Sequence, residues 1–311
     1  MVLQKLESTA LCIWRVTDGK RGHYRQSQGL VEALKGLVQV KVIDVPCLSF
    51  WRALWHLLAG RHLSIDESPD LLVGAGHATH MTLVAFGKLT GAKTVVLMKP
   101  SLPCHWFDLC IIPKHDDARG KNILVTEGAL NAMAMLAKDS KHHNSGLILI
   151  GGPSQHYQWD SHKIIAQIKL LTEATDYCTW VLSTSRRTPA NFLELLYQQV
   201  STQHLEIAPY HAVNEDWLPD QLAQAEVVWL SPDSVSMLYE ALTAGCSVGV
   251  FDLEAKPASA IVQSTHELIL QHKIVRFSDW QSKQHMPAAN TTFNEALRCA
   301  QWIKSNWFPN H

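Results

Sequence analysis

The sequence has few charged residues and no cluster of basic ones. Only 18% of its 311 residues are Asp, Glu, Lys or Arg, and the formal net charge is −1. No block of Lys and Arg stands out, so the chain lacks the basic patch that draws in a polyanion. We therefore expect no nucleic-acid partner.

Patterns of metal ligands and disulfides are missing as well. The seven cysteines are scattered, several lie in apolar runs, and no two form a Cys-x-x-Cys pair. This usage is typical of reduced, mostly buried thiols in a cytosolic protein. Neither His-Glu-x-x-His nor Asp-x-Asp occurs, although the chain has 17 histidines. We expect no bound metal and no cofactor.

Long apolar runs are absent too. No stretch of about 18 apolar residues occurs, and the N-terminus shows no apolar segment followed by a small-residue cleavage site. We expect a cytoplasmic protein. With 47% hydrophobic residues the chain can form a sizeable core, and its length favours two domains.

Short apolar or β-branched runs alternate with helix-like stretches along nearly the whole chain. The clearest candidate strands are residues 11–16, 38–45, 71–73, 94–98, 109–112, 147–150, 179–182, 227–230 and 247–251. Candidate helices include residues 24–37, 78–89, 164–174, 190–200, 235–244 and 259–271. Such alternation predicts an α/β protein with parallel sheets covered by helices on both faces.

Strand character is lost between Asn131 and Ser145, where the sequence becomes polar. We expect one domain at residues 1–135 and another at 145–311, with the last helix returning to the N-terminal domain. Each half begins with a strand, a glycine-containing turn and a helix. Open parallel sheets bind ligands at the carboxyl ends of their strands, so we expect these turns to line a central cleft.

The C-terminal half contains a glycine turn suited to an anion. An apolar strand leads into Gly151, Gly152, Pro153 and Ser154. Glycines allow backbone N–H groups to approach a phosphate, and the Ser154 hydroxyl can donate a hydrogen bond. An ordinary tight turn is the alternative.

A second turn, Ser231-Pro232-Asp233-Ser234, follows the strand at 227–230. Either Asp233 or Ser234 can cap the next helix, on which Ser236 and Glu240 share a face because they lie four residues apart. The helix N-terminus suits a phosphate, and Glu240 can accept both hydroxyls of a ribose. The segment predicts a nucleoside diphosphate site, with a capped helix and a solvated Glu240 as the alternative.

A third strand ends near Ser183 and leads to Arg186 and Arg187. The planar guanidinium fork matches the oxygens of a pyrophosphate. These residues are therefore further candidates for the same site, unless they are simply solvated.

The first loop of the chain is densely polar, with the order Asp18, Gly19, Lys20, Arg21, Gly22 and His23. Its two glycines and the following helix N-terminus can cradle a phosphate that the two bases neutralise. Either Asp18 or His23 can take a proton from an acceptor hydroxyl, and histidine is suited to this by its near-neutral pKa. The alternative is that Asp18 caps the helix and the bases are solvated.

A second loop in the N-terminal half contains Gly74 and Gly76, followed by His77 and His80 at a helix start. The positive end of a helix dipole lowers the pKa of an imidazole and favours the neutral base. His77 is therefore a further candidate base.

Residues 48–63 have the most unusual composition in the chain. Trp51 and Trp55 lie among other large apolar residues, with bases that include Arg61 and His62 interspersed. Such a helix suits a membrane interface, which would place the protein peripherally at the inner face of a membrane. Because the run is short, we expect a core helix, with membrane contact through the two tryptophans as the alternative.

Six motifs carry a resemblance to a known family. In order they are TDGKRGHYRQSQGLVEAL, VGAGHATH, the element Pro113 to Asp116, IGGPS, STSRRTP and SPDSVSMLYEALTAG. They resemble the family named after a plant mitochondrial fission factor, which has many bacterial members. That family is similar to two-domain glycosyltransferases of the GT-B type, including the peptidoglycan N-acetylglucosaminyltransferase. The resemblance implies a GT-B-like fold of two Rossmann-like parallel-sheet domains that face a central cleft.

The resemblance also implies roles for individual residues. In those transferases a GG-S loop and a Ser…Glu helix hold the UDP moiety, which implies donor binding by Gly151, Gly152, Ser154, Ser234 and Glu240. The expected acceptor-side set includes Gln26 and Gly76 besides the first loop. That loop differs from the GTGGH loop of the transferase, so the resemblance leaves the acceptor unassigned, with a lipid-linked or membrane-proximal acceptor among the options.

We therefore expect a metal-independent glycosyltransferase that uses a UDP-sugar donor, since GT-B enzymes generally need no metal. Two alternatives stay open. One is a binding or scaffold protein of the fission-factor type without turnover, and the other is a sugar-nucleotide epimerase or hydrolase on the same fold.

Overall fold

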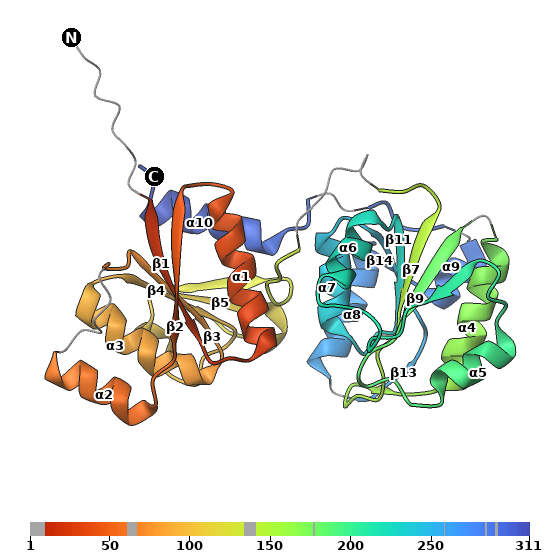
Figure 1. Cartoon of the computed structure of the whole chain (residues 1–311), viewed down its shortest axis with the longest axis horizontal. Coiled ribbons are helices and arrows are strands. Elements are labelled where there is room, and N and C mark those ends of the chain that lie inside the picture. The colour runs from red at the N-terminus through yellow and green to blue at the C-terminus, as the bar shows by residue number, and fades with distance from the viewer. Residues whose placement is uncertain are drawn as a thin grey trace, which may run out of the picture. The chain divides into compact units, whose positions relative to one another are not determined.

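The computed structural model describes residues 10–60, 67–133, 141–176, 178–257, 259–283, 285–289 and 292–311. The chain divides into two compact units (Figure 1). Unit 1 comprises Met1–Ala132 and Asn294–His311, and unit 2 comprises Met133–Phe293. Both are α/β, which confirms the fold class predicted from the alternation of strands and helices.

Unit 1 is built on a six-stranded parallel sheet in the order β2-β1-β3-β4-β5-β6. The strands are β1 (Leu11–Thr17), β2 (Val40–Pro46), β3 (Leu71–Ala75), β4 (Lys93–Leu97), β5 (Leu109–Pro113) and β6 (Ile123–Thr126). Short 3-10 turns follow three of them: η1 (His77–Thr79), η2 (Cys104–Trp106) and η3 (Lys114–Asp116).

Helices cover both faces of this sheet. They are α1 (Arg21–Lys35), α2 (Phe50–Ala59), α3 (His80–Thr90) and α10 (Glu295–Trp307). Successive strand residues point to opposite faces, so Ile13 packs with Leu30 of α1 and Ile303 of α10, whereas Trp14 packs with Phe86 of α3. The C-terminal helix α10 lies beside α1 and completes this core (Figure 1).

Unit 2 repeats the plan with a parallel sheet in the order β10-β9-β7-β11-β12-β14. These strands are β7 (Ser145–Leu149), β9 (Thr179–Ser183), β10 (Leu205–Ile207), β11 (Val227–Leu230), β12 (Ser247–Val250) and β14 (Ile274–Arg276). A separate antiparallel pair joins β8 (Tyr157–Gln158) to β13 (Glu254–Ala255).

Six helices flank the second sheet: α4 (Ser161–Ala174), α5 (Phe192–Gln199), α6 (Trp217–Gln224), α7 (Val235–Thr243), α8 (Ala260–Leu270) and α9 (Phe277–Lys283). Leu147 packs with α6, α7 and α8, while its neighbour Ile148 packs with α4, α5 and α9. Since both faces are covered, the central strands β7, β11 and β12 are buried over most of their length, as expected of a parallel sheet.

Cysteine placement agrees with the expectation of buried thiols. All seven cysteines are free, and five of them are buried. The other two, Cys47 and Cys104, are half-buried.

The prediction of a core helix at residues 48–63 is wrong for its aromatic side chains. Helix α2 forms, but it buries only Ala53 and His56. The exposed fractions of Trp51 and Trp55 are 75% and 51%, and Leu58 is 78% exposed. Helix α2 contacts α3 through a narrow stripe, which leaves the aromatic face uncovered. Arg61 and His62 lie outside the described residues.

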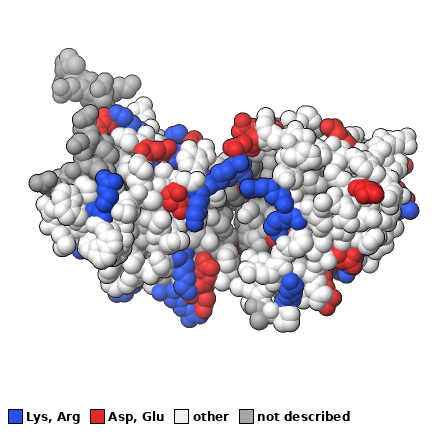
Figure 2. Space-filling model, turned by 60° about the horizontal axis from the view of Figure 1, so that its bottom comes forward, with Lys and Arg blue, Asp and Glu red and all other residues white. Residues whose placement is uncertain are grey.

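Charge is mixed over the face shown in Figure 2. Lys and Arg form small groups with Asp and Glu near them, and most of the visible surface is uncharged. Among the described residues, no helix is long and apolar enough to cross a membrane.

Candidate functional site

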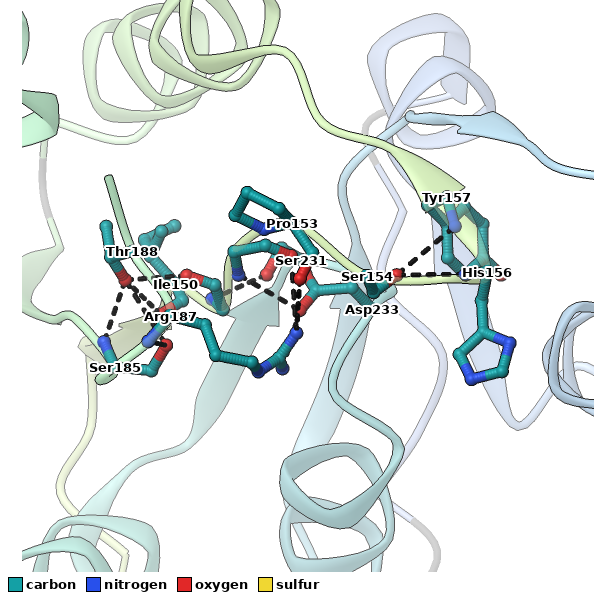
Figure 3. A network of polar contacts seen from close by, with 12 residues as sticks. Ile150, Pro153, Ser154, His156, Tyr157, Ser185, Arg187, Thr188, Ser231 and Asp233 are labelled. Carbon is teal, nitrogen blue, oxygen red and sulfur yellow. Dashed lines mark hydrogen bonds and ion pairs between the residues drawn. The ribbon is translucent and has the colours of Figure 1, made fainter.

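The site in unit 2 is formed by loops that follow neighbouring parallel strands. One loop follows β7 and contains Gly151, Gly152 and Ser154, and another follows β9 and contains Arg187. The third, residues 231–234, joins β11 to α7. Figure 3 shows how these loops meet at the carboxyl ends of their strands.

Asp233 is the buried centre of this site. Its side chain has no exposed surface, and its Oδ2 lies 2.7 Å from Arg187 Nη2. The same oxygen accepts a 3.0 Å hydrogen bond from the backbone N–H of Gly152, while the N–H of Gly151 donates to Ser231 Oγ at 2.7 Å. Within the part of the chain that the structure describes, the buried Oδ1 of Asp233 has no hydrogen-bond partner.

The two glycines are required by the packing of the loops. A Cβ on Gly152 would lie 2.0 Å from the carbonyl oxygen of Arg187, and one on Gly151 would lie 2.1 Å from Asp233 Oδ2. Thr188 adds a further tie, because its hydroxyl donates to the carbonyl of Gly151 at 2.6 Å. The glycines therefore let three loops approach each other, and their amides already bind the protein's own side chains.

The sequence predicted a side-chain cap at the N-terminus of α7, but no such cap forms. Ser234 is the N-cap residue, but its side chain makes no capping hydrogen bond. Asp233 does not cap the helix either, since its Oδ2 bonds to the β7 loop. The first-turn N–H groups of α7 thus have no side-chain cap, and a helix N-terminus of this kind suits an anion.

The other expected donor-site residues lie around this helix end. Ser236 is exposed and Glu240 half-buried, both on α7, and Arg186 is exposed beside Arg187. Ser183 is buried at the end of β9, where its hydroxyl donates to the Thr184 carbonyl. The hydroxyl oxygen of Ser154 accepts the N–H groups of His156 and Tyr157 at 3.1 and 3.2 Å.

In unit 1, the first loop brings an aspartate and a histidine together. Asp18 Oδ2 lies 2.9 Å from His23 Nδ1, and Asp18 Oδ1 accepts the N–H of Lys20 at 3.1 Å. Burial raises the pKa of Asp18, but the hydrogen bonds from His23 and Lys20 outweigh it and hold the pKa below its ordinary value. Asp18 therefore carries the negative charge that orients the His23 ring.

Gly76 supplies the surface against which His23 lies. It has a φ of +86°, and a Cβ there would lie 2.3 Å from the His23 ring. Only glycine combines this backbone conformation with such a close approach. The second loop of unit 1 thus contributes a wall to the Asp18–His23 pair.

The start of α1 differs from the prediction. The helix begins at Arg21 rather than Tyr24, so Gly22 and His23 belong to its first turn. Gly19 has a φ of +77° and makes the turn that precedes the helix, and Lys20 is exposed. Gln26 lies further along α1, and its buried Oε1 has no hydrogen-bond partner among the described residues.

The two histidines after Gly76 have opposite environments. His77 is exposed, whereas His80 is 2% exposed and its Nδ1 lies 3.1 Å from Ser101 Oγ. Burial, with smaller effects from His77 and His23, lowers the pKa of His80 to about 4. Among the residues that the structure describes, no group of three or more His, Cys, Asp or Glu side chains is placed to hold a metal ion.

The sequence did not indicate that Asp233 joins the loops after β7 and β9, or that Thr188 bonds to the glycine loop. Asp233 was a candidate helix cap, and Thr188 was not a candidate at all. The available signal was the segment 185–188, in which a second hydroxyl residue follows the arginine pair and can bond back to a neighbouring turn.

Comparisons with known proteins place these sites in a wider context. A family model described as "Mitochondrial fission ELM1" matches residues 21–307. An uncharacterized protein of Rickettsia prowazekii (strain Madrid E) is 24% identical, over 94% of this chain and 97% of that protein.

Solved structures match the fold. The UDP-GlcNAc 2-epimerase from Methanocaldococcus jannaschii is 12% identical with a TM-score of 0.58, over 96% of this chain and 100% of that chain. The glycotransferase of kitacinnamycin is 13% identical with a TM-score of 0.52, over 96% and 99% of the two chains. These similarities show that the chain has the GT-B-like fold.

Burial of His80 predicts a pH-dependent stability. The unfolded chain binds a proton at His80 near pH 6.5 and the folded chain only near pH 4, so the stabilising effect is complete above 6.5 and lost as the pH falls to about 4. We expect the free energy of unfolding in urea to fall by about 1–3 kcal/mol over this interval from His80 alone.

The variant His80→Gln should lose that part of the pH dependence, whereas His105→Gln, at an exposed position, should keep it. An unchanged slope in His80→Gln would show that His80 is not the titrating group.

Proposed function

Because the chain belongs to the Mitochondrial fission ELM1 family and has a GT-B-like fold, we propose that it is a metal-independent glycosyltransferase with a UDP-sugar donor. One observation carries the proposal: the uncapped N-terminus of α7 lies at the same sheet edge as Arg187 and precedes Glu240 on the same helix. The uncapped helix N-terminus suits a phosphate, and the Glu240 carboxylate suits the hydroxyls of a ribose.

Donor binding is assigned to unit 2. The first-turn N–H groups of α7 and the exposed Arg186 hold the diphosphate, and Glu240 accepts hydrogen bonds from the ribose hydroxyls. The choice of a UDP-linked donor is supported by the similarity in fold to the UDP-GlcNAc 2-epimerase from Methanocaldococcus jannaschii. No metal or cofactor takes part in this proposal.

Acceptor activation is assigned to unit 1. His23 removes the proton from an acceptor hydroxyl while Asp18 stabilises the imidazolium. The acceptor oxygen bonds to the anomeric carbon, the bond from that carbon to the phosphate oxygen breaks, and UDP leaves. Helix α7 and Arg186 stabilise the charge that develops on the diphosphate.

The two alternative functions predict different products from the same donor. An epimerase or hydrolase would act on a UDP-sugar without an acceptor, and a scaffold protein would release no UDP. A panel of UDP-, GDP- and CMP-sugars, assayed for binding and for free nucleotide with and without candidate acceptors, separates the three.

The exposed apolar face of helix α2 favours an additional proposal, that the protein contacts an anionic membrane surface. The exposed side chains Phe50, Trp51, Trp55 and Leu58 form an apolar face, and Arg52 lies among them. Aromatic residues with a neighbouring base are typical of helices that lie in a membrane interface. We propose that α2 brings the enzyme to an acceptor at the membrane.

Glu240→Ala should weaken UDP binding about tenfold to a hundredfold, since hydrogen bonds to a charged group contribute about 1.5–3 kcal/mol. Isothermal titration calorimetry measures the change. Glu194→Ala, on α5 of the same unit, is the control and should bind UDP like the wild type. Equal affinities in the two variants would rule out Glu240 as the ribose ligand.

His23→Ala should lower turnover about 10²- to 10⁴-fold, the usual cost of a positioned general base. Affinity for UDP should stay the same, because the donor is held by unit 2. Turnover is measured by UDP release with an established donor and acceptor. His105→Ala serves as the matched control, and retained turnover in His23→Ala would remove the histidine from the mechanism.

Replacing both Trp51 and Trp55 by Ser should reduce co-sedimentation with anionic liposomes about tenfold or more, because burying one large apolar side chain contributes about 1.5–3 kcal/mol. The double variant Leu170→Ser and Tyr197→Ser, which also removes two exposed apolar side chains, should bind like the wild type. Wild-type protein that ignores anionic liposomes at low salt would contradict the proposal.

A further inference from the structure

Unit 2 contains a cavity of about 800 Å³ that reaches Pro232, three residues before the start of α7. Its lining includes Tyr157, Pro232, the segment Phe251–Leu253, Arg276 and residues of α8 from Ala260 to Ile269. Pro232 lies between Ser231 and Asp233, whose side chains bond to the glycine loop. The cavity therefore lies at the same edge of the sheet as that loop, toward β12 and β14.

The wall between the cavity and the glycine loop is held by specific bonds. Lys256 Nζ donates to the carbonyl oxygen of Ser154 at 2.8 Å, and the N–H of Lys256 donates to the carbonyl of His156. His156 Nδ1 lies 2.8 Å from the hydroxyl of Ser259, the N-cap residue of α8. These contacts fix the cationic Lys256 between the loop and the cavity.

The charges that line the cavity are mainly positive. Among the described lining residues, Lys256 and Arg276 are permanent cations, His266 is a third basic group, and Asp252 is the carboxylate. Asp252 is already engaged, since its Oδ2 accepts the N–H of Ser278 at 2.8 Å and its Oδ1 lies 3.9 Å from Arg276 Nε.

Tyr157 lines the cavity without adding charge. Burial raises the pKa of its phenol, and Asp233 raises it further, while a hydrogen bond with Thr265 and the charge of Arg276 act in the opposite direction. The net effect is a raised pKa, so the phenol is neutral at physiological pH.

We infer that this cavity receives the glycosyl group of the donor and selects a sugar that carries a carboxylate. The inference rests on the proposed function, because a sugar attached to a diphosphate on α7 must lie beside that diphosphate. The volume is within the range of small-molecule sites. Lys and Arg side chains form charge-assisted hydrogen bonds with a carboxylate. Asp252 lies 3.9 Å from Arg276 and is the one carboxylate among the described lining residues, so a second carboxylate would balance the charge of Lys256.

Two donors that differ only at C6 test this inference. UDP-glucuronate has a carboxylate where UDP-glucose has a hydroxymethyl group. Calorimetry on the full chain should show that UDP-glucuronate binds about tenfold or more tightly than UDP-glucose, as expected for a hydrogen bond to a charged group. UDP alone provides the reference affinity.

Arg276→Gln should reduce this preference, measured as the ratio of the two sugar-nucleotide affinities, about tenfold. It should leave the affinity for UDP unchanged, because UDP has no sugar to place in the cavity. Arg276→Lys should keep most of the preference. Lys283→Gln makes the same charge change on α9, outside the cavity, and is the matched control. Lys256 also supports the loop at Ser154, so Lys256→Gln can weaken the binding of every donor. This variant is therefore compared with the wild type by the ratio of its affinities for UDP-glucuronate and UDP-glucose.

The outcomes separate the two hypotheses. UDP binding with equal affinities for UDP-glucose and UDP-glucuronate would overturn the carboxylate selectivity and leave the proposed function intact. A preference that survives in Arg276→Gln would also overturn the inference, since the cavity cation would not be its cause. No binding of UDP or of either sugar nucleotide would overturn both.

Discussion

The unit 2 site depends on one buried carboxylate. Transfer of a charge out of water costs several kcal/mol unless the charge is paired and hydrogen-bonded. Asp233 meets this requirement with the Arg187 guanidinium and the Gly152 N–H, which belong to loops after two other strands. The three loops are therefore held at fixed positions by the need to compensate a single charge. The close approach at Gly151 and Gly152 is a consequence, because a Cβ at either position would overlap this arrangement.

The same ion pair decides where an anion can bind. A phosphate on the Gly152 amide would compete with Asp233 and meet a like charge at short distance. Arg187 also donates to the carbonyl oxygens of Gly152 and Pro153, so part of its hydrogen-bonding capacity is used within the loop. The N-terminus of α7 has no such internal partner from a capping side chain. The glycine loop therefore supports the candidate site, and the N-terminus of α7 is the element to which the proposed function assigns the anion.

That the three polar turns of unit 2 meet could be predicted from the sequence, whereas the partners of their side chains could not. Polar turns after apolar strands must lie together, because the carboxyl ends of parallel strands share one edge of a sheet. A short polar residue before a helix predicts a cap, and for Asp233 a partner 81 residues away replaces that local bond. The short length of the run at residues 48–63 likewise favoured burial of Trp51, but whether another element covers α2 depends on tertiary packing that the length of a run does not encode.

Unit 1 shows why one histidine of its sheet edge suits proton transfer better than another. A general base needs one nitrogen fixed and the other accessible, and it needs affinity for a proton near the working pH. Asp18 fixes Nδ1 of His23, the Gly76 turn supports the ring, and the side chain stays 29% exposed. His80 is buried against Ser101 instead, and its pKa of about 4 makes it a poor proton acceptor at neutral pH. Burial thus makes His80 a poor candidate for the base. Asp18 and His23, five residues apart, form a hydrogen-bonded pair in which the carboxylate can stabilise a proton taken up by the imidazole.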